Sequence, residues 1–176
     1  MSAAVHPRAV LRAHREQALK TLRGEGRGQR LFAVLDSARD DAVLAWLEGS
    51  GATFASLYEG PQALEMAVAA PYLLEVPEGS ELLDTLMFEG WGQSWGIFLR
   101  SQRSFLEVRR HLRKHLLVQV EGVKNPVYFR FYDPRVLRVF LPTCTPAQVE
   151  EFHGPIQTFY AEGEDGKLQR FVNTRG

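Results

Sequence analysis

The chain has 176 residues, and its basic and acidic side chains balance to a formal net charge of zero. Its length is enough for one well-packed core or two small lobes, and its hydrophobic content is ordinary for a soluble globular protein. It contains no apolar run near the roughly 20 residues of a membrane helix, no secretory signal pattern, and only one cysteine, Cys144, which excludes an internal disulfide framework.

Predicted helices and strands alternate through the first 115 residues. Apolar periodicity and capping residues predict helices over residues 8–22, 43–47, 82–87 and 105–116, and strands over residues 31–35, 53–57, 70–76 and 95–100. A glycine-rich break at residues 24–28 follows the first helix. Because helices and strands alternate, we predict an α/β fold with a mixed, partly parallel sheet flanked by helices.

The second half of the chain has a different pattern. Two hairpins are predicted, one from residues 116–120 and 127–132 and the other from residues 156–161 and 168–172, with short helices at 134–141 and 146–152 between them. We therefore predict three parts: an N-terminal helix with its glycine-rich break (1–30), an α/β lobe (31–115) and a smaller α+β lobe packed on it (116–176).

A strand-to-helix junction is the most informative local pattern. Residues 127–132 alternate strictly, which predicts a strand. Asp133 is a good helix N-cap because its carboxylate can accept free backbone N–H groups, and Pro134 suits the first helical position. One face of the predicted strand carries three polar side chains: Tyr128, Arg130 and Tyr132.

Two roles are open for this polar face. In the structural role, Arg130 pairs with Asp36 or Asp133 and holds the two lobes together, since a partly buried arginine needs such a partner. In the recognition role, the two tyrosines and the arginine belong to a partner-binding surface, because these residue types are common at binding hot spots.

The charges are segregated along the chain. Every charged residue between Tyr58 and Gly90, from Glu59 to Glu89, is acidic, whereas the region from Arg100 to Lys114 is strongly basic. The two patches are therefore candidates to bind two different partners, with Arg109, Arg110 and Arg113 as the basic partner-binding residues. Nucleic acid is a weaker alternative partner, because the net charge is zero and no nucleic-acid-binding motif is present.

Catalysis by a serine hydrolase is the main alternative function. Residues 92–96 match G-x-S-x-G, and Ser94, Asp133 and His153 follow the order of the α/β-hydrolases. That motif requires a strand before the serine, whereas here a helix precedes it and a strand follows. The alternative interpretation is a tight entry into a strand, with the tryptophans at 91 and 95 as packing anchors.

A metal site is not expected either. His111 and His115 lie four residues apart on a predicted helix, which suits two metal ligands, but the sequence offers no evident third ligand. We therefore predict no catalytic residues, no metal and no cofactor.

Several short motifs, in this order, resemble the type VI secretion effector adaptors, also called effector chaperones, a family first catalogued as a domain of unknown function. The motifs are LD at residues 35–36, APYL at 70–73, GWGQSWGIF at 90–98, FRFYDPRVL at 129–137 and FLP at 140–142. Together they include five candidate structural residues: Asp36, Trp91, Trp95, Asp133 and Pro134. The resemblance spans about residues 31–159.

The resemblance implies a bacterial, cytoplasmic protein that is not an enzyme. Members of that family are thought to bind a toxic effector and help load it onto the VgrG spike without being secreted themselves. An effector toxin and VgrG are accordingly the expected partners, and no membrane association is expected.

Overall fold

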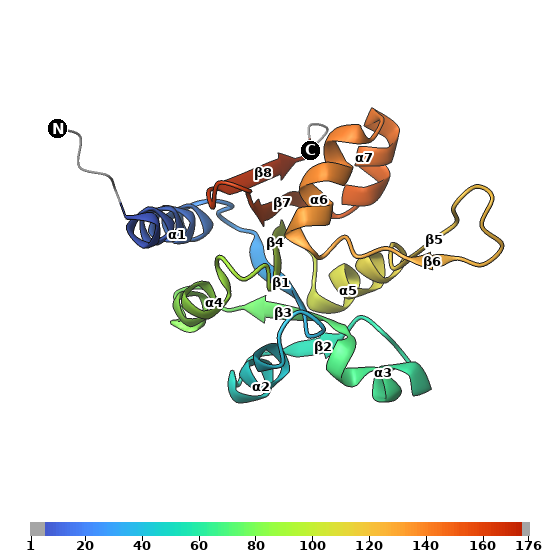
Figure 1. Cartoon of the computed structure of the whole chain (residues 1–176), viewed down its shortest axis with the longest axis horizontal. Helices are drawn as coiled ribbons and strands as arrows, with labels where there is room; N and C mark the ends of the chain where they lie inside the picture. The colour runs from blue at the N-terminus through green and yellow to red at the C-terminus, as the bar shows by residue number, and fades with distance from the viewer. Residues whose placement is uncertain (1–5, 174–176) are drawn as a thin grey trace.

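The computed structural model describes residues 6–173. Its centre is a six-stranded sheet with the strand order β2-β3-β1-β4-β7-β8 (Figure 1). The strands of this sheet are β1 (Arg30–Asp36), β2 (Phe54–Ser56), β3 (Pro71–Val76), β4 (Gly96–Ser101), β7 (Ile156–Glu162) and β8 (Leu168–Val172). The two short strands β5 (Leu117–Val118) and β6 (Val127–Tyr128) form a separate ladder.

The prediction of a partly parallel sheet is wrong, because every strand pairs antiparallel with its neighbours. The cause is the position of β3. Strands β1 and β2 run in the same direction, as a helical crossover requires, but β3 is inserted between them and runs the opposite way. Helices and strands therefore alternate along the chain as predicted. The two strands joined by a helical crossover, β1 and β2, are parallel in direction but are not neighbours in the sheet.

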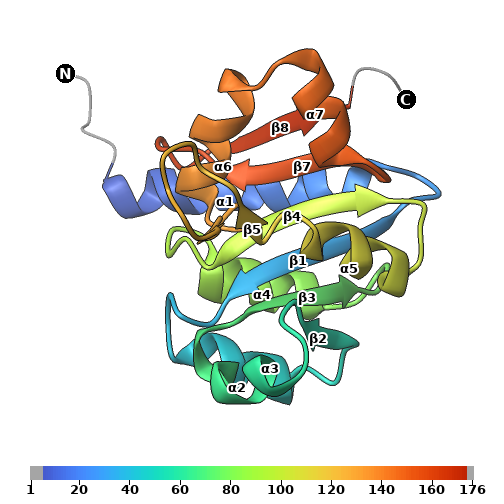
Figure 2. The ribbon, with the colours of Figure 1, turned by 90° about the vertical axis from the view of Figure 1, so that its right-hand side faces the viewer.

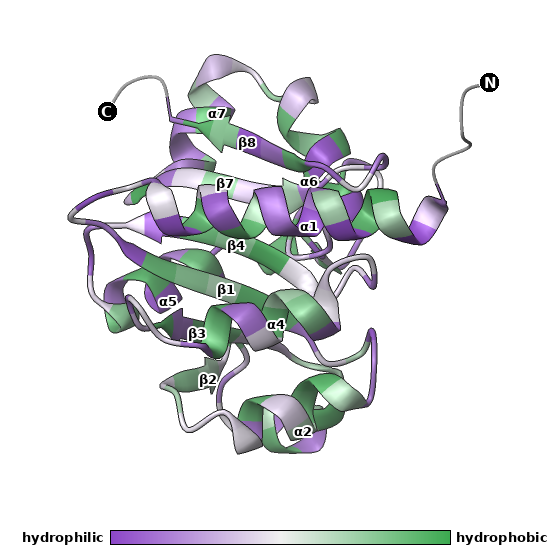
Figure 3. Cartoon of the chain, turned by 90° about the vertical axis from the view of Figure 1, so that its left-hand side faces the viewer, coloured by the Kyte–Doolittle hydropathy of each residue, from purple (hydrophilic) through white to green (hydrophobic). Residues whose placement is uncertain are grey.

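Helices cover both faces of the sheet. On one face lie α1 (Pro7–Gly24), α2 (Ala42–Gly49) and α4 (Leu82–Gly90), as Figure 3 shows. The opposite face, seen in Figure 2, carries α5 (Phe105–Arg113), α6 (Pro134–Phe140) and α7 (Pro146–His153). The short helix α3 (Pro61–Glu65) follows β2, and single 3-10 turns occur at Ala67–Ala69 and Leu141–Thr143.

The sheet crosses the boundary that the sequence suggests between residues 115 and 116. Strand β7 pairs with β4, so the last two strands extend the sheet of the α/β part. The end of α1 also contacts the last two strands. Glu25, just after α1, accepts a hydrogen bond from Tyr160 of β7 at 3.0 Å and pairs with Arg170 of β8 at 2.7 Å. The division into two lobes stays a prediction. Strands from both of the predicted lobes belong to the same sheet.

The strict alternation predicted for residues 127–132 is also wrong beyond Tyr128. Only two residue pairs join β5 to β6, and Phe131 and Tyr132 are both buried although they are neighbours. Burial of both rings is possible because the chain turns before α6, where the Asp133 N–H donates to the Arg130 carbonyl at 3.0 Å. Asp133 caps α6 as the sequence predicts, since its carboxylate accepts the N–H of Arg135 at 2.9 Å, with Pro134 at the helix start.

Candidate functional site

The two charged residues Asp36 and Arg130 join the end of β1 to the segment before α6. Their side chains form an ion pair, in which the Asp36 side chain is 2 % exposed and the Arg130 side chain 46 % exposed. The Asp36 carboxylate also accepts the N–H of Ala38 at 3.0 Å. Of the two partners that the sequence offers for Arg130, the structure therefore uses Asp36, and the pairing bridges 94 positions of the chain.

Two tyrosines, Tyr58 and Tyr132, lie close to this ion pair, and a third, Tyr128, contacts Tyr58. The hydroxyls of Tyr58 and Tyr132 are hydrogen-bonded, and burial raises the pKa of both groups. Tyr128 is half-exposed, with its ring 5.7 Å from that of Tyr58, and its hydroxyl accepts a hydrogen bond from Gln62 of α3. Of the predicted polar face, Tyr132 is thus buried, whereas Tyr128 and part of Arg130 remain accessible to a partner.

Asp133 has a partner of its own. Its carboxylate accepts two hydrogen bonds from the Arg135 guanidinium, at 3.0 and 2.6 Å. Burial alone would raise the pKa of Asp133, but the bonds from Arg135 outweigh that effect and lower it. The carboxylate is therefore held ionised as a cap at the start of α6.

The basic helix α5 is attached to the end of β2 and to the loop that follows it. Arg109 donates to the carbonyls of Ser56 at 2.8 Å and Tyr58 at 3.2 Å, and Arg113 donates to that of Leu57 at 2.8 Å. Both guanidiniums also pair with Glu59, at 3.1 and 2.8 Å.

The predicted acidic and basic patches contact each other in the structure. The acidic and basic patches are not fully separate surfaces, because Glu59 of the first neutralises two arginines of the second. Arg109 and Arg113 hold a loop of their own chain, whereas Arg110 is exposed and makes no ion pair within residues 6–173. Of the three predicted basic residues, Arg110 alone forms no ion pair in that part of the chain, although Glu107, three residues before it on α5, interacts with its charge.

The serine hydrolase residues are not assembled. Ser94 has a positive φ of 56°, but its turn is built around Glu162, whose carboxylate accepts the backbone N–H groups of Gly92, at 2.9 Å, and of Ser94. His153 is buried, with ring nitrogens 2.9 Å from the Val149 carbonyl and 3.1 Å from the Phe171 carbonyl. Both nitrogens therefore face carbonyl oxygens, and neither contacts the serine.

The tryptophans on either side of this turn are buried in the sheet–helix interface. The indole N–H of Trp91 donates to the Gly166 carbonyl at 3.0 Å, and that of Trp95 to the Asp40 carboxylate at 3.2 Å. Both rings thus fix the entry into β4 and connect it to elements distant in the chain.

His111 and His115 connect α5 to α7. His111 Nε2 lies 2.8 Å from the Phe152 carbonyl and 3.3 Å from His115 Nε2. Desolvation lowers the pKa of His111, and desolvation together with the neighbouring His111 lowers that of His115 to about 4. Within residues 6–173, no three His, Cys, Asp or Glu side chains are grouped so that they could hold a metal ion.

We expect the histidine pair to make the protein less stable as the pH falls from about 6.5 toward about 4. In that window the unfolded chain binds a proton that folded His115 does not, so acid favours unfolding. The contribution is about 1 kcal/mol between pH 7.5 and 5, after allowance for partial solvent exposure. Urea unfolding at the two pH values measures it. His115→Gln should lose this part of the pH dependence, and an unchanged dependence would contradict the assignment.

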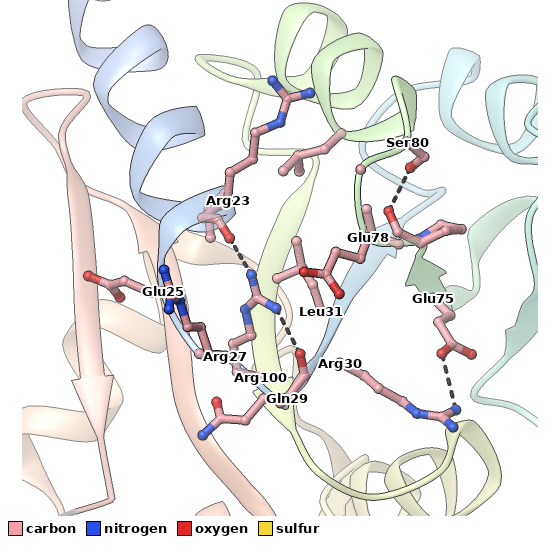
Figure 4. A pocket seen from close by; sticks show the side chains of 17 residues that line it. Arg23, Glu25, Arg27, Gln29, Arg30, Leu31, Glu75, Glu78, Ser80 and Arg100 are labelled. Atoms are coloured by element: carbon pink, nitrogen blue, oxygen red, sulfur yellow. Dashed lines mark hydrogen bonds and ion pairs between the residues drawn. The ribbon is translucent and has the colours of Figure 1, made fainter.

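A cavity lies at the other end of the sheet, between the loop after α1 and the loop after β3 (Figure 4). It has a volume of about 540 Å³. The buried Arg100 lines it and donates to the carbonyls of Leu22 and Gln29, and burial lowers its pKa. On the rim, Arg23 pairs with Asp84 and Arg30 with Glu75. The contacts of Arg100 attach the glycine-rich break to the sheet, whereas the buried Nε of the same side chain has no hydrogen-bond partner within residues 6–173.

A comparison with protein families identifies the central part of the chain. The model of a domain of unknown function, DUF4123, matches residues 31–151. The chain belongs to the DUF4123 family. The DUF4123 region begins in β1 and ends in α7, so it contains the Asp36–Arg130 ion pair and the capped start of α6. Helix α1 and strands β7 and β8 lie outside it.

Neither the curated proteins nor the solved structures yield a match to the chain. None of the helices within residues 6–173 combines the length and the hydropathy that crossing a membrane requires.

Proposed function

We propose that this DUF4123 protein is a cytoplasmic, non-enzymatic adaptor of a bacterial type VI secretion system. In this proposal it binds a toxic effector and helps load it onto the VgrG spike. The observation that carries the proposal is the family match over residues 31–151, which covers the ordered motifs that resemble the effector adaptors. An adaptor must bind and then release its cargo, which calls for moderate interfaces with polar rims rather than a permanent apolar one.

The side-chain contacts support a binding role more than a catalytic one. The charged groups of the junction and of α5 are mostly paired within the fold, as Asp36, Asp133 and Glu59 show. Ser94 and His153 bind different parts of the chain. Several large hydrophobic side chains are also exposed, among them Leu117, Val127 and Tyr128, and such side chains contribute to protein–protein recognition.

Affinity purification of the tagged full-length protein from its native cell, followed by mass spectrometry, tests the proposal. We expect enrichment of a toxin encoded near this chain and of a VgrG spike protein, relative to a tag-only control. Enrichment of neither protein under conditions in which the secretion system is active would contradict the adaptor function.

Serine-directed labelling tests the non-enzymatic part separately. With a fluorophosphonate probe we expect no labelling above that of Ser94→Ala, because the only base predicted for this serine, His153, faces two carbonyl oxygens. Stoichiometric labelling that disappears in Ser94→Ala would contradict this expectation and would favour the hydrolase.

A further inference from the structure

Residues 117–128, here called the projecting hairpin, extend away from the body of the molecule (Figure 1). None of these residues is buried. The segment nevertheless carries five of the large hydrophobic side chains that are exposed: Leu117, Val120, Val123, Val127 and Tyr128. Such a concentration on one protruding element is typical of an interaction site.

The body of the protein does not cover these side chains. Leu117 pairs with Tyr128 and Val118 with Val127, so successive pairs point to opposite faces of the ladder. Apolar groups are therefore exposed on both faces of the projecting hairpin, which no single surface of its own chain can cover. Tyr128 is its anchor, through the Tyr58 ring and Gln62.

The ladder itself is incomplete. It consists of two residue pairs, extended by the Phe129 N–H donating to the Leu116 carbonyl at 2.8 Å, and its tip is closed by local bonds between residues 119 and 123. A two-stranded hairpin of this size is marginal in water, and no strand within residues 6–173 pairs with its outer backbone groups. A third strand would pair these groups and cover one apolar face.

We propose that the projecting hairpin binds an extended, apolar segment of the effector by strand addition. The tip carries one acid, Glu121, and one base, Lys124, so its own charge is balanced and favours an apolar ligand. At its base, Arg110 and Lys114 are exposed and make no ion pair within residues 6–173, which favours carboxylates flanking the bound segment. This inference rests on the proposed adaptor function, and it names the surface and the kind of segment bound.

Photo-crosslinking in the native cell tests the location. The full-length protein carries the photoreactive residue p-benzoylphenylalanine at position 120 or, as a matched control, at position 139 on α6, where Val139 is 65 % exposed. We expect position 120 to crosslink to an apolar segment of the co-purifying effector, and position 139 not to crosslink to it.

A second measurement tests the binding mode. Val120→Asp combined with Val123→Asp should weaken effector binding at least tenfold while leaving the melting temperature unchanged, because both side chains are exposed. Val139→Asp should leave both quantities unchanged. In hydrogen exchange of the complex, amides along one edge of the projecting hairpin should gain protection.

Several outcomes would overturn the inference. They are a crosslink from position 120 to a second copy of this chain or to VgrG, equal effector crosslinking from position 139, or wild-type binding by the double variant. If the effector still co-purifies in these cases, the adaptor function stands and only the assigned surface is wrong. If no effector co-purifies with the wild type, the proposed function fails, and this inference fails with it.

Discussion

Gly96→Ala should unfold well below the wild type, by roughly 6 °C or more in melting temperature. A Cβ at this position would lie 1.9 Å from the Val34 carbonyl oxygen, which belongs to the backbone of the adjacent central strand and cannot rotate away. Relief of the clash would require β1 and β4 to separate where both are buried. We expect a cost of about 3 kcal/mol, at the upper end of the range for overpacked cores, and thermal unfolding measures it.

Gly49→Ala is the matched control for this prediction. Gly49 is the last residue of α2, and a Cβ there would meet no atom within 4 Å. Its melting temperature should stay the same or rise slightly, because alanine favours the helix. If Gly96→Ala melted like this control, the close approach of β4 to β1 would be incorrect.

Arg130→Ala should destabilise the protein by about 2 kcal/mol, because it leaves the buried Asp36 carboxylate without its cationic partner. The loss is below the 3–5 kcal/mol typical of fully buried pairs, since the half-exposed arginine leaves a path for water. Urea unfolding measures this change. It separates the two roles that the sequence leaves open for Arg130, because a recognition residue would weaken partner binding at unchanged stability.

Two further variants sharpen this test. Asp36→Asn in the Arg130→Ala background should recover part of the lost stability, because a neutral amide is cheaper to bury unpaired than a carboxylate. Arg110→Ala, which removes an exposed arginine with no ion pair in the described part of the chain, should leave stability within about 0.5 kcal/mol of the wild type. Equal stability of Arg130→Ala and Arg110→Ala would exclude the structural role.

Local sequence signals predicted most of the elements correctly. The predicted N-cap Asp133 lies where α6 begins, and strands β7 and β8 form the predicted second hairpin. Helix α3 was missed, since its five residues are too few to show a helical period. The antiparallel pairing of the sheet was not predicted. It depends on β3 lying between β1 and β2, and a local sequence pattern does not show which strands become neighbours.

The candidate site was predictable in its residues but not in its contacts. The sequence identified Arg130 and offered two acids for it, and only the folded chain brings Asp36 to it across 94 positions. The arginines of α5 looked like free binding residues because Glu59 and the carbonyls of the loop after β2 lie more than 45 residues away in sequence. The sequence predicts the projecting hairpin as a hairpin. It does not show that the hairpin is exposed, because exposure depends on how the rest of the chain packs.

The pairing of β7 with β4 has a consequence for folding during synthesis. Strand β4 ends at Ser101, but its partner begins only at Ile156, so a translating ribosome must add more than 50 residues before this sheet edge can close. Until then the apolar strand β4 can pair with β1 on one side only and leaves its other edge open, and the contact of Glu25 with Tyr160 forms later still. Such long-range closure is slow and exposes the nascent chain to aggregation, so we expect the growing chain to depend on general chaperones during that interval.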